Sequence, residues 1–149
     1  MDSLVVRPMG DDRYAVHVRG HELIVDQPVA VGGTDIGPTP VELFAASLAS
    51  CVAHYAGGFL ARHDVCREGL RVDMTWQMSP GRPSRVERFT VQITPPPALP
   101  RERLPALLAV TRACTVHNSL EQTPTVSIEL TNANVVARRP SPAPVRQPG

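Results

Sequence analysis

The sequence predicts a single α+β domain. Its apolar patterns place strands first, then a helix, two more strands, a second helix and a final strand. This order differs from the regular strand–helix alternation of a doubly wound parallel sheet. The 149 residues suffice for one domain, and with 42% hydrophobic but only 4% aromatic residues the core should consist mainly of Val, Leu, Ala and Ile.

The N-terminal part of the chain is predicted to form β structure. Residues 14–18 and 22–25 are mostly apolar, and Arg19 and Gly20 between them favour a hairpin turn. A loop rich in Gly, Pro and Thr follows over residues 29–40. Because its core, GGTDIGPTP, holds three glycines and two prolines, we expect one held conformation there.

A helix is predicted directly after this loop. Thr39 is a suitable N-cap, and Pro40 suits the first helical position. Apolar residues then recur at steps of three and four, and residues 43–60 are almost uncharged and rich in Ala, Ser and Gly. A helix that is small and apolar on nearly every side should lie at the centre of the fold.

The second half of the chain alternates between strand and helix signals. Apolar residues alternate over residues 70–78 and 89–93, which predicts two half-buried strands. A second helix is expected over residues 101–113, with Pro105 in its first turn. Residues 119–122 resemble a capping box that opens a short turn, and residues 126–130 alternate like a final strand.

Composition limits the class of protein. The domain is expected over residues 1–137, because residues 138–149 are a Pro- and Arg-rich tail without enough apolar surface to fold. Fifteen basic and fourteen acidic residues give a formal charge of +1, which does not favour nucleic-acid binding. We expect neither a membrane-spanning segment nor a signal peptide. Three cysteines, an odd number, favour a reducing cytoplasm over a disulfide-stapled secreted fold.

Two cysteines are candidates for chemistry. Cys51 falls on the apolar stripe of the first helix, where a small buried hydrophobe is an equally good interpretation. Cys114 follows Arg112 and precedes His117, and such cationic neighbours favour the reactive thiolate. Core packing is the alternative for this cysteine as well. Two cysteines on two buried helices could also meet and form a reversible disulfide.

Three pairs have the spacing of metal ligands: Cys51 with His54, His63 with Cys66, and Cys114 with His117. A structural zinc site needs four converging ligands, which usually lie on loops rather than on an apolar helix stripe. We therefore expect no metal and no other cofactor, and Cys66 is interpreted as incidental.

Two stretches resemble motifs of the OsmC/Ohr family, the osmotically inducible protein C and organic hydroperoxide resistance proteins. The first is GGTDIGPTPVELFAASLASC, which ends at Cys51, and the second is RACTVHNSL, which contains Cys114. The resemblance covers residues 14–130. It implies the OsmC-like fold, an intertwined α+β homodimer with antiparallel sheets wrapped around central helices.

The resemblance also implies a thiol peroxidase for organic hydroperoxides. Cys51 would be the peroxidatic cysteine, which attacks the peroxide as a thiolate and becomes a sulfenic acid. Cys114 would resolve it by forming a disulfide, and a dithiol, of the lipoyl type in several relatives, would then reduce that disulfide. A nearby second thiol is chemically suited to this role because it prevents over-oxidation.

The family also uses an Arg and a Glu at the thiolate. Hydroperoxide-resistance members carry the Glu directly after the motif proline, where this chain has Val41, and the acid here is Glu42. On a regular helix Glu42 would lie opposite Cys51, so it would serve either the partner subunit or the first turn of its own helix. Arg13 is the first candidate for the arginine and Arg19 is the second.

These departures leave a second function open. The fold could retain little peroxidase activity and bind a small apolar ligand in a pocket at the dimer interface. A third possibility, with Cys51 as an acyl-transfer nucleophile, would need a base and an oxyanion hole. His54, one turn further along the helix, is the nearest candidate base.

Overall fold

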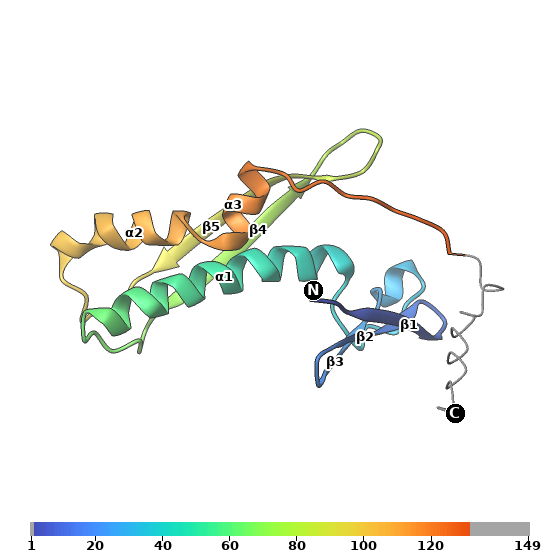
Figure 1. Cartoon of the computed structure of the whole chain (residues 1–149), viewed down its shortest axis with the longest axis horizontal. Helices are drawn as coiled ribbons and strands as arrows, with labels where there is room; N and C mark the ends of the chain where they lie inside the picture. Colours follow the sequence, from blue (N-terminus) through green and yellow to red (C-terminus); the bar gives the residue numbers. More distant parts are fainter. Residues whose placement is uncertain (1, 132–149) are drawn as a thin grey trace, which may run out of the picture.

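The computed structural model describes residues 2–131, so the tail expected at residues 138–149 lies outside the described residues. Figure 1 shows an elongated arrangement in which one long helix joins two separate sheets. The strands and helices follow in the order β1 (Val5–Gly10), β2 (Arg13–Val18), β3 (His21–Val25), α1 (Pro40–Arg62), β4 (Arg71–Met78), β5 (Val86–Thr94), α2 (Leu104–Arg112) and α3 (Thr115–Glu121). Short 3-10 helices, η1 (Val29–Val31) and η2 (Arg101–Arg103), precede α1 and α2.

Both sheets are antiparallel, which confirms the predicted α+β class. β2 lies between β1 and β3 in a three-stranded sheet, and β4 pairs with β5 in a two-stranded sheet. The predicted hairpin at Arg19 and Gly20 joins β2 to β3, whereas β1 was not predicted as a separate strand. Figure 1 shows the three-stranded sheet beyond the N-terminal end of α1, while β4 and β5 lie along the helix.

A buried aspartate fixes the loop between β3 and α1. The carboxylate of Asp26 accepts hydrogen bonds from the Thr34 hydroxyl (2.6 Å) and from the backbone N–H groups of Gln27 (2.7 Å), Thr34 (3.2 Å) and Ile36 (3.1 Å). The Thr34 hydroxyl above all, together with these N–H groups, lowers the pKa of Asp26 to about 2, although burial acts in the opposite direction. The loop therefore has the held conformation that its composition predicted.

Two glycines of the motif allow this loop to fold back on its own chain. A Cβ atom at Gly33 would overlap the carbonyl oxygen of Gln27, and one at Gly37 would overlap the carbonyl oxygen of Ile24. Only a residue without a side chain fits such close backbone approaches. The GGTDIG stretch is thus required by packing between the loop and β3.

The loop ends in the N-cap of α1, as predicted. The Thr39 hydroxyl accepts a hydrogen bond from the Glu42 backbone N–H (3.2 Å), and the Glu42 carboxylate accepts one from the Thr39 backbone N–H (2.7 Å). This is a complete capping box, and Pro40 follows the cap in the first turn. The sequence therefore sets the start of the helix that carries Cys51.

One face of α1 is buried within the chain: Ala45, Leu48, Val52, Ala56, Gly57, Phe59 and Leu60. The opposite face, with exposed residues such as Ser50 and His54, is not covered by other described residues of this chain. By length and composition α1 also meets the criterion for a membrane span, contrary to the expectation that no segment does. A core helix meets the same criterion, and α1 packs against β4, β5, α2 and α3.

The buried side chains form two clusters along α1. Around the C-terminal half of the helix, Phe59 and Leu60 pack with Leu99 and Leu107. Nearer the middle, Leu48 and Val52 pack with Cys114. Apolar side chains of β4 and β5 cover this second cluster: Val72, Met74, Phe89, Val91 and Ile93.

Two predicted elements are wrong in detail. The second capping box does not open a helix, because α3 begins at Thr115 and Ser119 lies inside it, with its hydroxyl donating to the Thr115 carbonyl (2.9 Å). Residues 126–130 are not a strand in the described chain. A strand needs a neighbour for its backbone groups, and no described strand pairs with this segment.

Candidate active site

Cys51 lies midway along α1, where the exposed and buried faces of the helix meet. Its side chain is half-buried and packs against the cluster formed by Leu48, Val52 and Cys114. More than two helical turns separate it from the N-cap, so the dipole of α1 has little effect at its sulfur. Its environment is therefore set by the side chains packed around it.

Cys114 is fully buried and occupies the N-cap position of α3. Its backbone is extended, with φ −67° and ψ 145°, and its sulfur accepts a hydrogen bond from the His117 backbone N–H at 3.4 Å. Cysteine is not among the usual N-cap residues, which explains why the sequence did not predict the start of this helix. The cap fixes the direction in which the thiol points.

The structure brings the two thiols together. Burial chiefly raises the pKa of Cys114, and hydrogen bonding and charge from the neighbouring Cys51 side chain raise it further, while the His117 N–H opposes the shift. Both cysteines are free thiols here. Cys114 is thus held in the protonated form beside a less buried partner.

A second contact fixes α1 against the start of α3. The hydroxyl groups of Tyr55 and Thr115 lie 3.0 Å apart within hydrogen-bonding distance. Tyr55 is one helical turn beyond Cys51, and Thr115 directly follows Cys114. This pair, which sequence reasoning missed, stabilises the approach of the two segments that carry the thiols.

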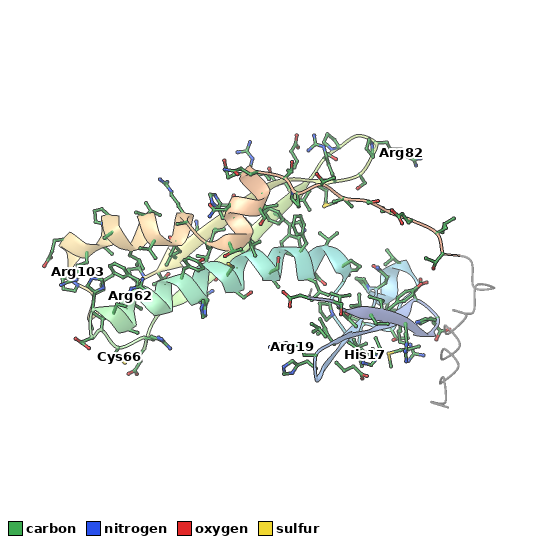
Figure 2. All side chains as sticks on the ribbon, in the orientation of Figure 1. His17, Arg19, Arg62, Cys66, Arg82 and Arg103 are labelled. Atoms are coloured by element: carbon green, nitrogen blue, oxygen red, sulfur yellow. The ribbon has the colours of Figure 1, made fainter. Side chains whose placement is uncertain are left out.

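The other candidate residues have different partners within the chain. Arg13 donates to the Gly10 carbonyl (3.3 Å) and pairs with Asp11 (3.2 Å) at the turn between β1 and β2. Figure 2 shows Arg19 on the three-stranded sheet, beyond the N-terminal end of α1. The carboxylate of Glu42 is engaged in the capping box. Within one chain, the two arginines belong to the three-stranded sheet, and Glu42 lies in the first turn of α1, nine residues before Cys51.

Cys66 lies apart from the other two cysteines. It is exposed in the loop after α1, and its sulfur accepts a hydrogen bond from the Glu68 backbone N–H at 3.5 Å. Figure 2 shows it below the C-terminal end of the helix. Across residues 2–131, no three His, Cys, Asp or Glu side chains are grouped closely enough to hold a metal ion.

Two surface hollows include residues of the buried cluster around Cys114 or residues that pack against it. One, of about 450 Å³, is floored by Leu48 and Val52 and by apolar side chains of β5, with Arg112, His117 and Glu121 among its polar lining residues. The other, of about 310 Å³, lies between α1 and α2 and is lined by His54, Tyr55, Gly58, Arg62, Val110 and Ala113. Sequence reasoning identified the cysteines but neither hollow, because both depend on how α2 and α3 pack on α1.

Several solved structures share this fold. One is a protein of Psychrobacter arcticus 273-4 whose name refers to osmotic stress and detoxification responses; it is 26% identical, with a TM-score of 0.71 over 80% of this chain and 88% of that chain. An organic hydroperoxide resistance protein OsmC of Legionella pneumophila is 17% identical, with a TM-score of 0.53 over 79% and 88%. Another organic hydroperoxide resistance protein, from Elizabethkingia anophelis, is 17% identical, with a TM-score of 0.58 over 83% and 91%.

None of the curated protein sequences matches the chain significantly. The profile of the OsmC-like protein family matches residues 32–129. This match begins at the glycine loop, includes both cysteines and ends after α3, so it contains the whole thiol site. The chain belongs to the OsmC-like protein family.

Proposed function

We propose that this protein is a thiol peroxidase for organic hydroperoxides, with Cys51 as the attacking residue. The Cys51 thiolate attacks one peroxide oxygen, the O–O bond breaks, and the alkoxide takes up a proton and leaves as an alcohol. Sulfur is oxidised to the sulfenic acid and the peroxide is reduced. The first step thus converts one hydroperoxide into one alcohol.

In the second step the Cys114 thiol attacks the sulfenic acid. A disulfide forms between Cys51 and Cys114, and the hydroxyl group leaves as water. An external dithiol, of the lipoyl type in our proposal, then exchanges with the disulfide. The cycle ends with two protein thiols and an oxidised dithiol.

The observation that carries this proposal is the adjacency of a half-buried and a fully buried thiol on α1 and α3. Cys51 is the thiol with access to an incoming peroxide, whereas Cys114 has no exposed surface. Burial keeps the pKa of Cys114 raised, which suits a resolving thiol better than an attacking one. The apolar side chains of β4 and β5 beside this cluster favour an organic over an inorganic peroxide.

The proposed enzyme is a homodimer. The apolar residues Val126, Ile128 and Leu130 are 76%, 90% and 100% exposed in the single chain. They alternate with polar residues, and a second copy would supply the strand neighbour that the described chain does not provide. In such a dimer, Arg13 of one copy would lie close to the thiols of the other copy.

A second candidate function is binding of a small apolar ligand without efficient peroxide reduction. The engagement of Glu42 in the helix cap favours it, because that carboxylate then has a structural role in its own chain. The 450 Å³ hollow beside Leu48 and Val52 would be the binding place. Native mass spectrometry of the purified protein would detect a retained ligand.

The direct assay follows consumption of cumene hydroperoxide with dihydrolipoamide as the reductant. We expect turnover by the wild-type protein and loss of it, by at least about a hundredfold, in Cys51→Ser, because the nucleophile is removed. Cys66→Ser is the matched control and should retain the wild-type rate. Equal rates for wild type and Cys51→Ser would reject the peroxidase, and a retained ligand would then favour the binding function.

A further inference from the structure

The thiol of Cys114 is closed off from solvent in the single chain. Its proposed attack on Cys51 requires the loss of the thiol proton, because the thiolate is the attacking form. Burial chiefly raises the pKa of this thiol and so holds the proton in place. A thiol in such a position needs a neighbouring group that accepts its proton during the attack.

His117 is joined to Cys114 at the start of α3. Its backbone N–H donates a hydrogen bond to the Cys114 sulfur at 3.4 Å. The two residues are three positions apart, and Cys114 is the N-cap of the turn in which His117 lies. The hydrogen bond therefore keeps the backbone of His117 at the sulfur atom that has to react.

The His117 ring contains a buried nitrogen without a partner. Its Nδ1 atom is inaccessible to solvent and makes no hydrogen bond with any group among residues 2–131. Buried polar atoms in proteins are nearly always paired, so an unpaired one points to a role that the resting structure does not satisfy. The helix cap uses only the backbone of His117, which leaves the ring available for chemistry.

Glu121 is placed to orient this ring. Its carboxylate Oε1 lies 3.7 Å from the other ring nitrogen, Nε2, one turn further along α3. Because a carboxylate only accepts protons, it favours the ring proton on Nε2 and leaves a free lone pair on Nδ1. Arg112 of α2 is the other charged residue that lines the hollow beside His117 and Glu121, and the lining side chains of α1 and β5 are apolar.

We propose that His117 accepts the thiol proton of Cys114 through Nδ1, with Glu121 as the positioning residue for the ring. The inference rests on the proposed peroxidase, to whose resolving step it adds a residue. As the Cys114 sulfur bonds to the Cys51 sulfur, the S–O bond of the sulfenic acid breaks, Nδ1 takes the thiol proton, and the departing hydroxide receives that proton and leaves as water. Nδ1 and the sulfur are not hydrogen-bonded in the reduced chain, so the partly exposed ring turns toward the sulfur for the transfer.

A disulfide reagent isolates this step from the reaction with peroxide. In a protein that carries Cys66→Ser, dithiobis(nitrobenzoate) first couples to Cys51 and releases one thionitrobenzoate. Cys114 then attacks the Cys51 sulfur of the mixed disulfide and releases a second thionitrobenzoate, while the thiol proton passes through His117 to solvent. The second release is intramolecular, so its rate does not depend on the reagent concentration, and stopped-flow absorbance separates it from the first.

We expect His117→Ala to slow the second release at least about tenfold and to leave the first release unchanged. His117→Asn, which keeps a polar side chain without a basic nitrogen, should be equally slow. Free imidazole should restore the rate in His117→Ala, because the shortened side chain opens onto a hollow of about 450 Å³. Glu121→Gln should be slowed less than His117→Ala. His21→Ala, at an exposed histidine of β3, is the control and should behave as the parent protein.

The results distinguish this inference from the proposed function. Restoration by imidazole in a protein that consumes no cumene hydroperoxide would retain the proton acceptor and reject the peroxidase. Equal rates of the second release in the parent protein, His117→Ala and His117→Asn would overturn the acceptor role and leave the peroxidase standing. A slow second release that imidazole does not restore would assign His117 a purely structural role at Cys114 and would overturn the proposal as well.

Discussion

At the scale of single residues, the two thiols differ in access and in environment. Local sequence favours Cys114 as the reactive thiolate because Arg112 and His117 are close to it along the chain. The structure instead favours the protonated thiol of Cys114, since burial and the neighbouring Cys51 raise its pKa. Solvent access and tertiary neighbours outweigh adjacency in the sequence at this site.

This difference predicts the order of oxidation. Peroxide treatment in the presence of a sulfenic-acid trap should label Cys51 in the Cys114→Ser protein and leave Cys114 almost unlabelled in the Cys51→Ser protein. Peptide mass spectrometry measures both. Label found mainly on Cys114 would reverse the two roles and support the argument from sequence neighbours.

Asp26 predicts a pH dependence of stability. Its pKa is about 2 in the folded chain and ordinarily near 3.8, so the carboxylate stabilises the fold above about pH 4 and loses this effect as the pH falls toward 2. Asp26→Asn should therefore melt at a lower temperature than wild type at pH 6, and the gap should narrow below pH 4. A gap that stays constant from pH 6 to pH 2.5 in thermal melts would contradict the assigned role.

The sequence identified Cys51 and Cys114 but not Asp26 or Tyr55. Both cysteines stand in motifs that can be found by their spacing. Asp26 is important because three backbone N–H groups and the Thr34 hydroxyl converge on it, and this convergence exists only once the loop has folded back. Tyr55 depends likewise on the packing of α3 against α1.

At the scale of elements, the capping box of α1 predicts separate effects for its two members. Thr39→Ala should lower the free energy of unfolding by about 1 kcal/mol, because the Glu42 N–H loses its acceptor. Glu42→Gln keeps an acceptor for the Thr39 N–H and should be nearly neutral in both stability and peroxidase rate. Chemical denaturation measures the free energy of unfolding, and the cumene hydroperoxide assay measures the peroxidase rate. A hundredfold loss of rate in a stable Glu42→Gln protein would instead make Glu42 part of the chemistry.

Elements with strong local signals were predicted well. Thr39 and Pro40 marked the start of α1, and the apolar alternation marked β4 and β5. The start of α3 was missed because its cap is a cysteine, and the strand at residues 126–130 was predicted from an alternation that has no pairing partner in the described chain. The apolar pattern of a segment predicts which of its faces is apolar, but it does not predict which other element packs against that face.

At the scale of the whole molecule, one chain leaves much apolar surface uncovered. The three-stranded sheet exposes Val5, Val6 and Leu23, and Val126, Ile128 and Leu130 are largely or fully exposed. Figure 1 shows that the two sheets have only α1 between them. Exposed apolar surface on this scale is typical of an interface.

The proposed dimer predicts a difference between two neighbouring substitutions. Ile128→Asp places a charge on the apolar side of residues 126–130 and should weaken dimerisation by at least about tenfold, whereas Ser127→Asp on the polar side should not. Light scattering during dilution measures the dissociation. A wild-type protein that is folded and monomeric at micromolar concentration would contradict the dimer.

The central claim is that Cys51 and Cys114 form one redox pair. One molar equivalent of cumene hydroperoxide is added to the reduced Cys66→Ser protein, and disulfide and alcohol are quantified by mass spectrometry and chromatography. The account predicts one disulfide between Cys51 and Cys114 and one released alcohol for each chain, and dihydrolipoamide should reduce the disulfide back to the two thiols. Unchanged thiols, or a sulfenic acid on Cys51 that persists with Cys114 still reduced, would contradict it.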